Sequence, residues 1–389
     1  MSSTDAPAPC LQAMPAETLL KIMELSNPSD VTSLSRSAKV FYTLFDNYKA
    51  STMRRSLQNL PEFDLLLYLY TSNREELQPS RLFHPRVIDC ETTSGTVNLM
   101  DADNIPRWFT GIPVPMFTFT SYDFEELWKR AKVIDWWVEM YPRLRWRDAP
   151  EDRRCLRPAE DARLRKAVAR WWLYAHYHHG FSYWHRSYLQ PKKWDASDTR
   201  LMQVRLMPTS EIRELADLWC RVRDTVSKDL CSSPERVCLC KDGYGVDLVP
   251  WGADEGRHSK IVRTYMKLDP EQLQYYLIRY SNWKKTVTID AISGCSKDFS
   301  RDTETLSVAL NKVLEERMDV KGVAAWRSLP RFGILDEDRA DEQQHAEWLN
   351  DRWLDGRVPL DLQQIATLPQ DTSSLVCRGD DGTDAFVPF

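Results

Sequence analysis

The chain has 389 residues, 42% of them hydrophobic and 28% charged, which is enough for two or three folded domains or one large irregular one. Its formal net charge of -5 argues against a protein whose whole surface binds a polyanion, although local basic patches stay open. Nine cysteines without a regular spacing indicate a reducing compartment. No leader sequence and no apolar run of roughly 18 residues occurs, so we expect an intracellular protein, cytoplasmic or nuclear, away from membranes.

Residues 1–9 are small, polar and rich in proline, and we expect them to be disordered. A helix is predicted after them, with Pro15 at its first position and Asn27-Pro28 as its end. Its apolar residues span roughly 220 degrees when each position advances 100 degrees. They are Ala16, Leu19, Leu20, Ile22, Met23 and Leu25, with Glu17, Lys21 and Glu24 opposite. A helix with one neighbour needs a stripe of only about 100 degrees, so this one should be covered on two sides, by the larger domain or by a separate partner.

Two more short helices should follow, one capped by Ser29 or Asp30 and one by Ser37. Most of the remaining chain shows the apolar spacing of amphipathic helices. These segments are 122–141, 159–179, 210–230, 269–280, 304–318 and the acidic 336–354, with Pro142 and Gly180 expected to end the first two.

Strand signals are few. Residues 87–90 with 96–99, and 237–240 with 246–249, each flank a glycine turn and are predicted as short hairpins, while 105–117 should be an irregular connection. The predicted fold is therefore mainly α. A small three-helix unit over 10–56 precedes a larger, irregular, aromatic-rich helical domain over 57–389 with one or two β-hairpins.

The first three helices carry a family resemblance. The carriers are Met14-Pro15-Ala16-Glu17, Leu19-Leu20-Lys21-Ile22, Leu34, Ser37, Lys39, Phe41-Tyr42 and Leu44. This pattern resembles the F-box, a small helical unit that docks on the Skp-family adaptor of cullin-based SCF ubiquitin ligases. Met14 replaces the usual leading leucine, a change that a flexible apolar contact tolerates. Ala38 replaces a small polar residue and removes a hydrogen bond, but the apolar surface for docking stays.

The resemblance implies a set of adaptor-binding residues, some of which must face the protein's own interior. The set is Met14, Pro15, Leu19, Leu20, Ile22, Met23, Leu25, Val31, Leu34, Val40, Phe41 and Leu44. The alternative is that these helices are simply the N-terminal part of one helical fold.

The downstream domain resembles the non-repeat helical region of fungal F-box proteins, through residues 169–174 and 211–216. The resemblance thus implies a non-catalytic substrate receptor, which joins a Skp-family adaptor and a cullin–RING ligase to an unknown protein target without a cofactor. A helical interaction or structural protein is the alternative. An enzyme would need a pocket of convergent polar groups, and no catalytic motif in the sequence indicates such a pocket.

Other clusters are weighed against plainer interpretations. Basic residues from Arg153 to Arg170 precede aromatic ones, a pattern seen in single-strand nucleic-acid binding, yet acidic neighbours dilute the charge and favour a solvated helix face. His176 with His179 has the spacing of a helical metal pair, but no further ligand follows, so we expect no metal. The group Cys231, Cys238 and Cys240 lacks the second pair of cysteines or histidines that a zinc site usually needs. Residues 242–245 suit a hairpin turn better than a phosphate loop.

Overall fold

A computed structural model describes residues 11, 14–72, 86–92, 95–100, 114–179, 194, 198–230, 236–239, 246–249, 262–280, 304–321 and 332–339. The protein is mainly α-helical with a few short strands, which confirms the predicted fold class. Its contacts divide the chain into two compact units. Unit 1 comprises residues 1–71 and 85–136, and unit 2 comprises 72–84 and 137–389, so residues 10–56 are one part of a larger unit.

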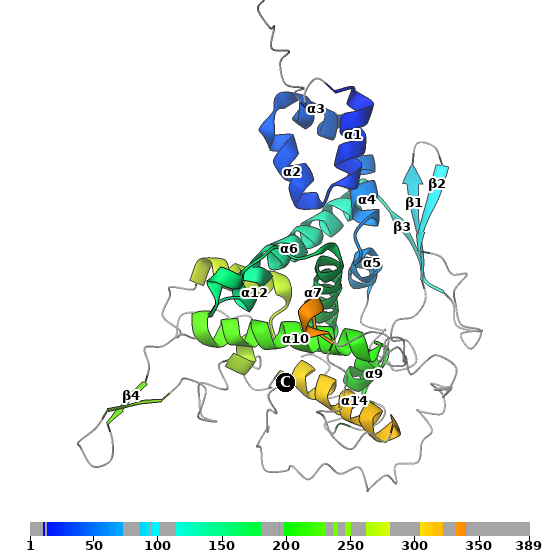
Figure 1. The fold of residues 1–389 in the computed structure, drawn as a ribbon. Helices are drawn as coiled ribbons and strands as arrows, with labels where there is room; N and C mark the ends of the chain where they lie inside the picture. Colours follow the sequence, from blue (N-terminus) through cyan, green and yellow to red (C-terminus); the bar gives the residue numbers. More distant parts are fainter. Residues whose placement is uncertain are drawn as a thin grey trace, which may run out of the picture. The chain divides into compact units, whose positions relative to one another are not determined.

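Unit 1 begins with five helices and ends in the first part of a sixth (Figure 1). They are α1 (Ala16–Leu25), α2 (Pro28–Ser37), α3 (Lys39–Asn47), α4 (Lys49–Gln58), α5 (Phe63–Thr71) and α6 (Ser121–Arg145), whose first part belongs to this unit. The sequence predicted the first three and assigned no element to α4 or α5. Within this unit α1 packs against α3 and α4, and α2 packs against α3.

The predicted helix caps were wrong. Asn27 and Ala38 take the N-cap positions of α2 and α3, without a side-chain cap at either. Pro28 begins α2, because a first-turn proline has no N–H group to satisfy. Ser37 ends α2, and its hydroxyl donates to the carbonyl of Leu34.

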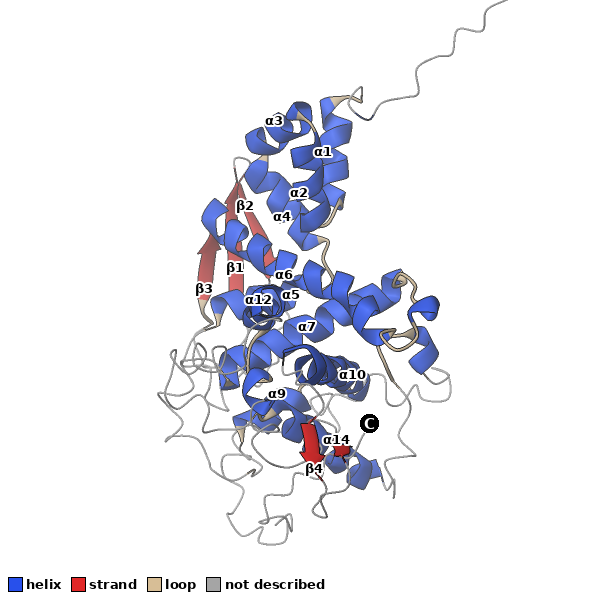
Figure 2. Ribbon diagram, turned by 90° about the vertical axis from the view of Figure 1, so that its left-hand side faces the viewer, coloured by secondary structure: helices blue, strands red, loops and turns tan. Residues whose placement is uncertain are grey.

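A three-stranded sheet completes unit 1. Its order is β2 (Gly95–Met100), β1 (Val87–Thr92), β3 (Met116–Phe119), with β1 antiparallel to β2 and parallel to β3 (Figure 2). The predicted hairpin is confirmed, and Gly95 supplies a φ of 124° at the turn, which glycine adopts without strain. The irregular connection predicted over 105–117 was wrong at 116–117, which belong to β3. Buried Phe119 stacks edge-to-face on Tyr70 of α5 at 5.5 Å.

Unit 2 contains the end of α6 and most of the remaining elements. They are α7 (Pro158–His178), α9 (Thr199–Arg205), α10 (Thr209–Thr225), the π-helical η7 (Val226–Leu230), α12 (Pro270–Tyr280), α14 (Leu306–Lys321), the 3-10 turns η5 (Pro150–Asp152) and η9 (Asp336–Asp338), and the antiparallel pair β4 (Arg236–Leu239) and β5 (Val246–Val249). The hairpin and the helices near 159–179, 210–230, 269–280 and 304–318 are confirmed.

Two predicted ends in unit 2 differ. Helix α6 continues through Pro142 to Arg145, so Pro142 does not close it. Fully buried Tyr141, whose hydroxyl donates to Asp217 at 3.1 Å, holds this turn in place although proline gives no hydrogen bond there. The acidic segment opens as η9 and not as an α-helix, while 340–354 and Gly180 lie outside the described residues.

The core of unit 2 is built around three tryptophans from three helices. Trp171 of α7 stacks edge-to-face on Trp137 of α6 at 5.1 Å and on Trp219 of α10 at 5.6 Å. All three are at most 1% exposed, and the indole N–H of Trp137 donates to the carbonyl of Pro270 at 3.0 Å. The central ring therefore ties α6, α7 and α10 into one core.

Trp171→Ala should lower the free energy of unfolding of unit 2 by about 3–5 kcal/mol, because it removes the central ring of this stack and leaves a cavity. Ile278→Ala is the matched control, since Ile278 is 59% exposed and should cost less than about 0.5 kcal/mol. Urea unfolding of the full chain, followed by circular dichroism, measures both. Equal midpoints for the two variants would contradict this assignment of the core.

Candidate functional site

The wide apolar arc of α1 is only partly covered by the chain. Leu19 and Met23 are 1% and 0% exposed, Leu20 and Ile22 are half-buried, and Leu25 is 63% exposed. Leu19 and Met23 are four positions apart and share one helix face, which is the face turned inward. The remaining apolar positions therefore lie beside this face or opposite to it.

The other residues of the predicted docking set divide in the same way. Across the whole set, the structure buries Leu19, Met23, Val31 and Phe41, half-buries Leu20, Ile22, Leu34 and Leu44, and exposes Met14, Pro15, Leu25 and Val40. The four buried residues build the core of these helices. The eight others keep apolar atoms available on the surface.

Three further apolar residues of this region are exposed although they were not in the predicted set. They are Leu11, Tyr42 and Tyr48, at 37%, 58% and 50%. Tyr42 could have been found from the sequence. Two adjacent helix positions point about 100 degrees apart, so a helix that turns Phe41 toward its core directs Tyr42 away from the centre of that core.

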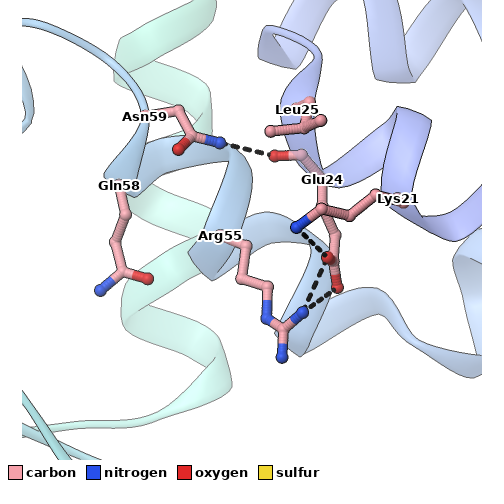
Figure 3. A pocket seen from close by; sticks show the side chains of 6 residues that line it. All are labelled: Lys21, Glu24, Leu25, Arg55, Gln58 and Asn59. Atoms are coloured by element: carbon pink, nitrogen blue, oxygen red, sulfur yellow. Dashed lines mark hydrogen bonds and ion pairs between the residues drawn. The ribbon is translucent and has the colours of Figure 1, made fainter.

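An ion pair between buried Glu24 and half-exposed Arg55 joins α1 to α4 (Figure 3). Glu24 is 4% exposed, and its two carboxylate oxygens accept from one guanidinium nitrogen of Arg55 at 2.9 and 2.8 Å. The side-chain amide of Asn59 donates to the Glu24 carbonyl at 2.8 Å, and Lys21 lies 3.8 Å from the carboxylate. The sequence placed Glu24 on the solvent side of the helix, which was wrong because Arg55 neutralises it at the α1–α4 contact.

Leu25 projects beside this ion pair. It lines an open pocket of about 210 Å³ together with Lys21, Glu24, Arg55, Gln58 and Asn59 (Figure 3). The pocket is mostly polar, with one exposed leucine at its border. An apolar side chain of a partner would thus contact Leu25 beside Glu24, Arg55 and Asn59, whose polar groups bond one another.

The same helices are anchored to α6 within unit 1. The N–H and the hydroxyl of Ser29 both donate to Asp135, at 3.0 and 2.5 Å. Phe45 of α3 lies 6.2 Å from Trp128, ring centre to ring centre. Helix α6 therefore covers a part of the apolar surface that the first three helices cannot cover by themselves.

The basic cluster of residues 153–170 is largely paired with acids. Five of its seven members form ion pairs: Arg154 with Glu160 and Glu337, Arg157 with Asp336 and Glu337, Arg163 with Asp336, Arg165 with Asp161, and Arg170 with Glu211. Each acid cancels a positive charge of this region, which lowers its net attraction for phosphates. This arrangement weighs against a nucleic-acid surface at α7.

The histidines of α7 serve packing. The ring of His178 bonds Gln203 at 2.7 Å, and Nε2 of His179 accepts the N–H of Thr305 at 3.2 Å. Burial lowers the pKa of His178 to about 3, so this ring is neutral. His176 is exposed, and no group of three possible metal ligands occurs among the described residues. His185, Cys231, Cys240 and the loop 242–245 lie outside them, as does the side chain of Cys238.

Glu160 is a second fully buried carboxylate, at the first turn of α7. It accepts from two nitrogens of Arg154 at 2.7 and 2.6 Å, from the N–H of Arg157 at 2.7 Å and from the N–H of Asp336 at 3.0 Å. Burial by itself would raise the pKa of Glu160, but these hydrogen bonds lower it from 4.5 to about 2. Its charge therefore holds together residues that are far apart in the sequence.

Comparison with protein-family models, with curated proteins and with solved structures found no match to this chain. No helix in the described part of the chain has the length and apolarity to cross a bilayer. The function is therefore argued from the residues of the surface itself.

Arg55→Ala should destabilise unit 1 by about 1–3 kcal/mol, because it leaves the buried Glu24 carboxylate without its main partner. The double variant Glu24→Gln with Arg55→Ala should recover part of this loss, since no buried charge is left unpaired. Arg36→Ala, an exposed arginine on α2, is the control. Urea midpoints report all three, and a double variant at least as unstable as Arg55→Ala alone would contradict the role of Arg55 as the partner of the buried carboxylate.

Glu160→Gln tests the carboxylate in unit 2. A depressed pKa adds stability above pH 4.5 that is lost as the pH falls through about 2. At pH 7 the variant should therefore be less stable by at most about 3 kcal/mol, and its difference from wild type should shrink as the pH falls from 4.5 toward 2. Urea unfolding at pH 7, 4.5 and 3 measures the trend, with exposed Glu151→Gln as control. A difference that does not change with pH would contradict the assignment.

Proposed function

We propose that this protein is a non-catalytic receptor subunit of an SCF-type ubiquitin ligase, which docks on a Skp-family adaptor through α1, α2 and α3. The observation that carries the proposal is the apolar surface that the chain leaves uncovered on these helices. Four of the residues that the F-box resemblance assigns to the adaptor are exposed, and four more are half-buried.

The division of the predicted set suits a docking unit. Leu19, Met23 and Phe41, with Val31, hold the helices together from inside, so the unit does not need the adaptor to keep its shape. Leu25 and Val40, 63% and 50% exposed, would be removed from water by a partner. Each such burial is worth about 1.5–3 kcal/mol, which would give a few residues a large share of the binding energy.

The mechanism of such a receptor is proximity. The ligase holds the target near the ubiquitin carrier and so raises their effective concentration. No residue of this chain has to form or break a covalent bond in that role. The remainder of the chain, including the aromatic core of unit 2, would provide the rigid support for the target.

A helical interaction protein without a ligase role is the second candidate. The anchoring of α2 and α3 to α6 through Ser29–Asp135 and Phe45–Trp128 favours it, because these contacts make the first helices a part of unit 1. It leaves the exposed Leu25, Val40 and Tyr42 without a role.

Co-purification with a recombinant Skp-family adaptor tests the proposal. Wild type should retain the adaptor, and Leu25→Asp with Val40→Asp should weaken the complex at least about tenfold, because each change places a charge in the apolar contact. Both positions are exposed, so the fold should survive, which buried Phe41 at 3% exposure would not allow. Calorimetry or surface plasmon resonance gives the affinities.

Met116→Asp and Tyr122→Asp are matched controls, since these side chains are 73% and 64% exposed in the same unit but lie outside the first three helices. They should bind the adaptor as wild type does. Failure of folded wild-type protein to bind any Skp-family adaptor would overturn the proposal, and so would an equal loss of binding in the control variants.

A further inference from the structure

Residues 332–339 form a short segment of unit 2 that is held by side chains of other elements. Its apolar half is buried, with Phe332, Ile334 and Leu335 at 5%, 0% and 1% exposure. Its acidic half, Asp336–Asp338, is the turn η9, drawn in orange between α7 and α10 in Figure 1. The segment thus has a large apolar residue, a glycine, two further large apolar residues and then three acids.

The backbone of this segment is gripped by side chains. The N–H of Ile334 donates to Asp217 of α10 at 3.1 Å, and Arg163 of α7 donates to its carbonyl at 2.9 Å. The N–H of Asp336 donates to buried Glu160. Side chains of α7 and α10 therefore pair three main-chain groups of the segment, as buried polar groups require.

The acidic half is matched by arginines. Arg145 donates to both carboxylate oxygens of Asp338 at 2.8 and 2.9 Å, and Arg154 lies 2.9 Å from Glu337. Arg157 and Arg163 both bond Asp336. Three of these arginines belong to the basic cluster of residues 153–170, so the acidic turn supplies part of the negative charge that pairs with it, beside Glu160, Asp161 and Glu211.

Gly333 allows the close approach of the two halves. A Cβ atom at this position would lie 2.6 Å from the Cβ of Asp338, which is too close for any side chain. The recognised shape is therefore specific. A large apolar residue comes first, then a glycine, two further large apolar residues, and a tight acidic turn.

We propose that the surface of α6, α7 and α10 that holds residues 332–339 is a binding site for target proteins, and that this segment occupies it as an internal competitor. The partner it fits is an unstructured protein segment with a large apolar residue, a glycine, two further large apolar residues, three acidic residues and a basic one, in that order. The inference rests on the proposed receptor role for its biological purpose, but the binding itself does not require an adaptor.

Displacement of the segment is physically reasonable. Asp336, Glu337 and Asp338 keep 35%, 55% and 33% of their side chains exposed, and such exposed pairs are weak and screened by salt. The segment also ends in a buried pair, in which Arg339 donates to Glu214 at 2.8 Å. A target that remakes each contact must therefore carry a basic residue after its acids. The internal copy has the advantage of its high effective concentration, so wild type should bind a free peptide weakly.

The test uses a fluorescent peptide with the sequence of residues 332–339, Phe-Gly-Ile-Leu-Asp-Glu-Asp-Arg, and the full chain. The double variant Asp336→Ala with Asp338→Ala weakens the internal copy and keeps its apolar anchors. Fluorescence anisotropy should show at least about tenfold tighter peptide binding to this variant than to wild type. A peptide with Asn, Gln and Asn in place of the three acids should bind at least about tenfold more weakly.

Added to the double variant, Arg163→Ala should remove most of the peptide affinity, whereas Lys166→Ala on the same helix should leave it unchanged. No binding of the acidic peptide to the folded double variant would overturn the proposal, as would equal binding of the acidic and neutral peptides. Adaptor binding is measured separately on the same proteins, so the receptor role can fail while peptide binding persists, and the reverse.

Amide hydrogen exchange of wild type gives a second measurement if the double variant does not fold. The amides of Ile334 and Asp336 should exchange at least about tenfold faster than the central amides of α7, because the segment opens locally. Equal protection of these amides and α7 would mean that the segment leaves only on global unfolding, which would overturn the proposal.

Discussion

The carboxylate of Glu24, buried at the α1–α4 contact and paired with half-exposed Arg55, helps to fix which side of α1 faces outward. A carboxylate out of water requires a partner, so the helix must turn this residue toward α4. Leu19 and Met23 are then brought into the core on the adjoining face, and Leu25 is left on the opposite side. The outward apolar surface of the first helices therefore follows from one polar contact as much as from apolar packing.

Helical periodicity predicted most helices well, because the apolar spacing that marks a helix depends only on residues close together in the sequence. It placed the segments of α7, α10, α12 and α14, and the glycine turn predicted the β1–β2 hairpin. It failed where a distant contact decides the outcome. The continuation of α6 past Pro142 depends on buried Tyr141 and its bond to Asp217, and β3 forms by pairing with β1.

The candidate docking surface could be predicted only in part for the same reason. The helical wheel gave Leu19 and Leu25 equal weight, because it cannot say which side of an apolar arc is inside. It assigned Glu24 to solvent because Arg55 lies 31 positions further along the chain. The resemblance therefore named most of the apolar residues on these helices but missed Leu11, Tyr42 and Tyr48, and their division into core and surface required the fold.

The basic cluster of α7 illustrates how a charge pattern depends on its partner. In sequence, the arginines suggested either a solvated face or a phosphate-binding one, since their acidic partners in η9 lie 173 to 183 positions away. In the fold, the same guanidinium groups and the buried Glu160 form a cradle for a peptide backbone with an acidic turn. The same hydrogen bonds and ion pairs would form whether the bound segment belongs to this chain or to a target protein. The internal segment therefore competes with any target. A target must match its apolar residues and its acids closely enough to overcome the high effective concentration that covalent attachment gives the internal segment.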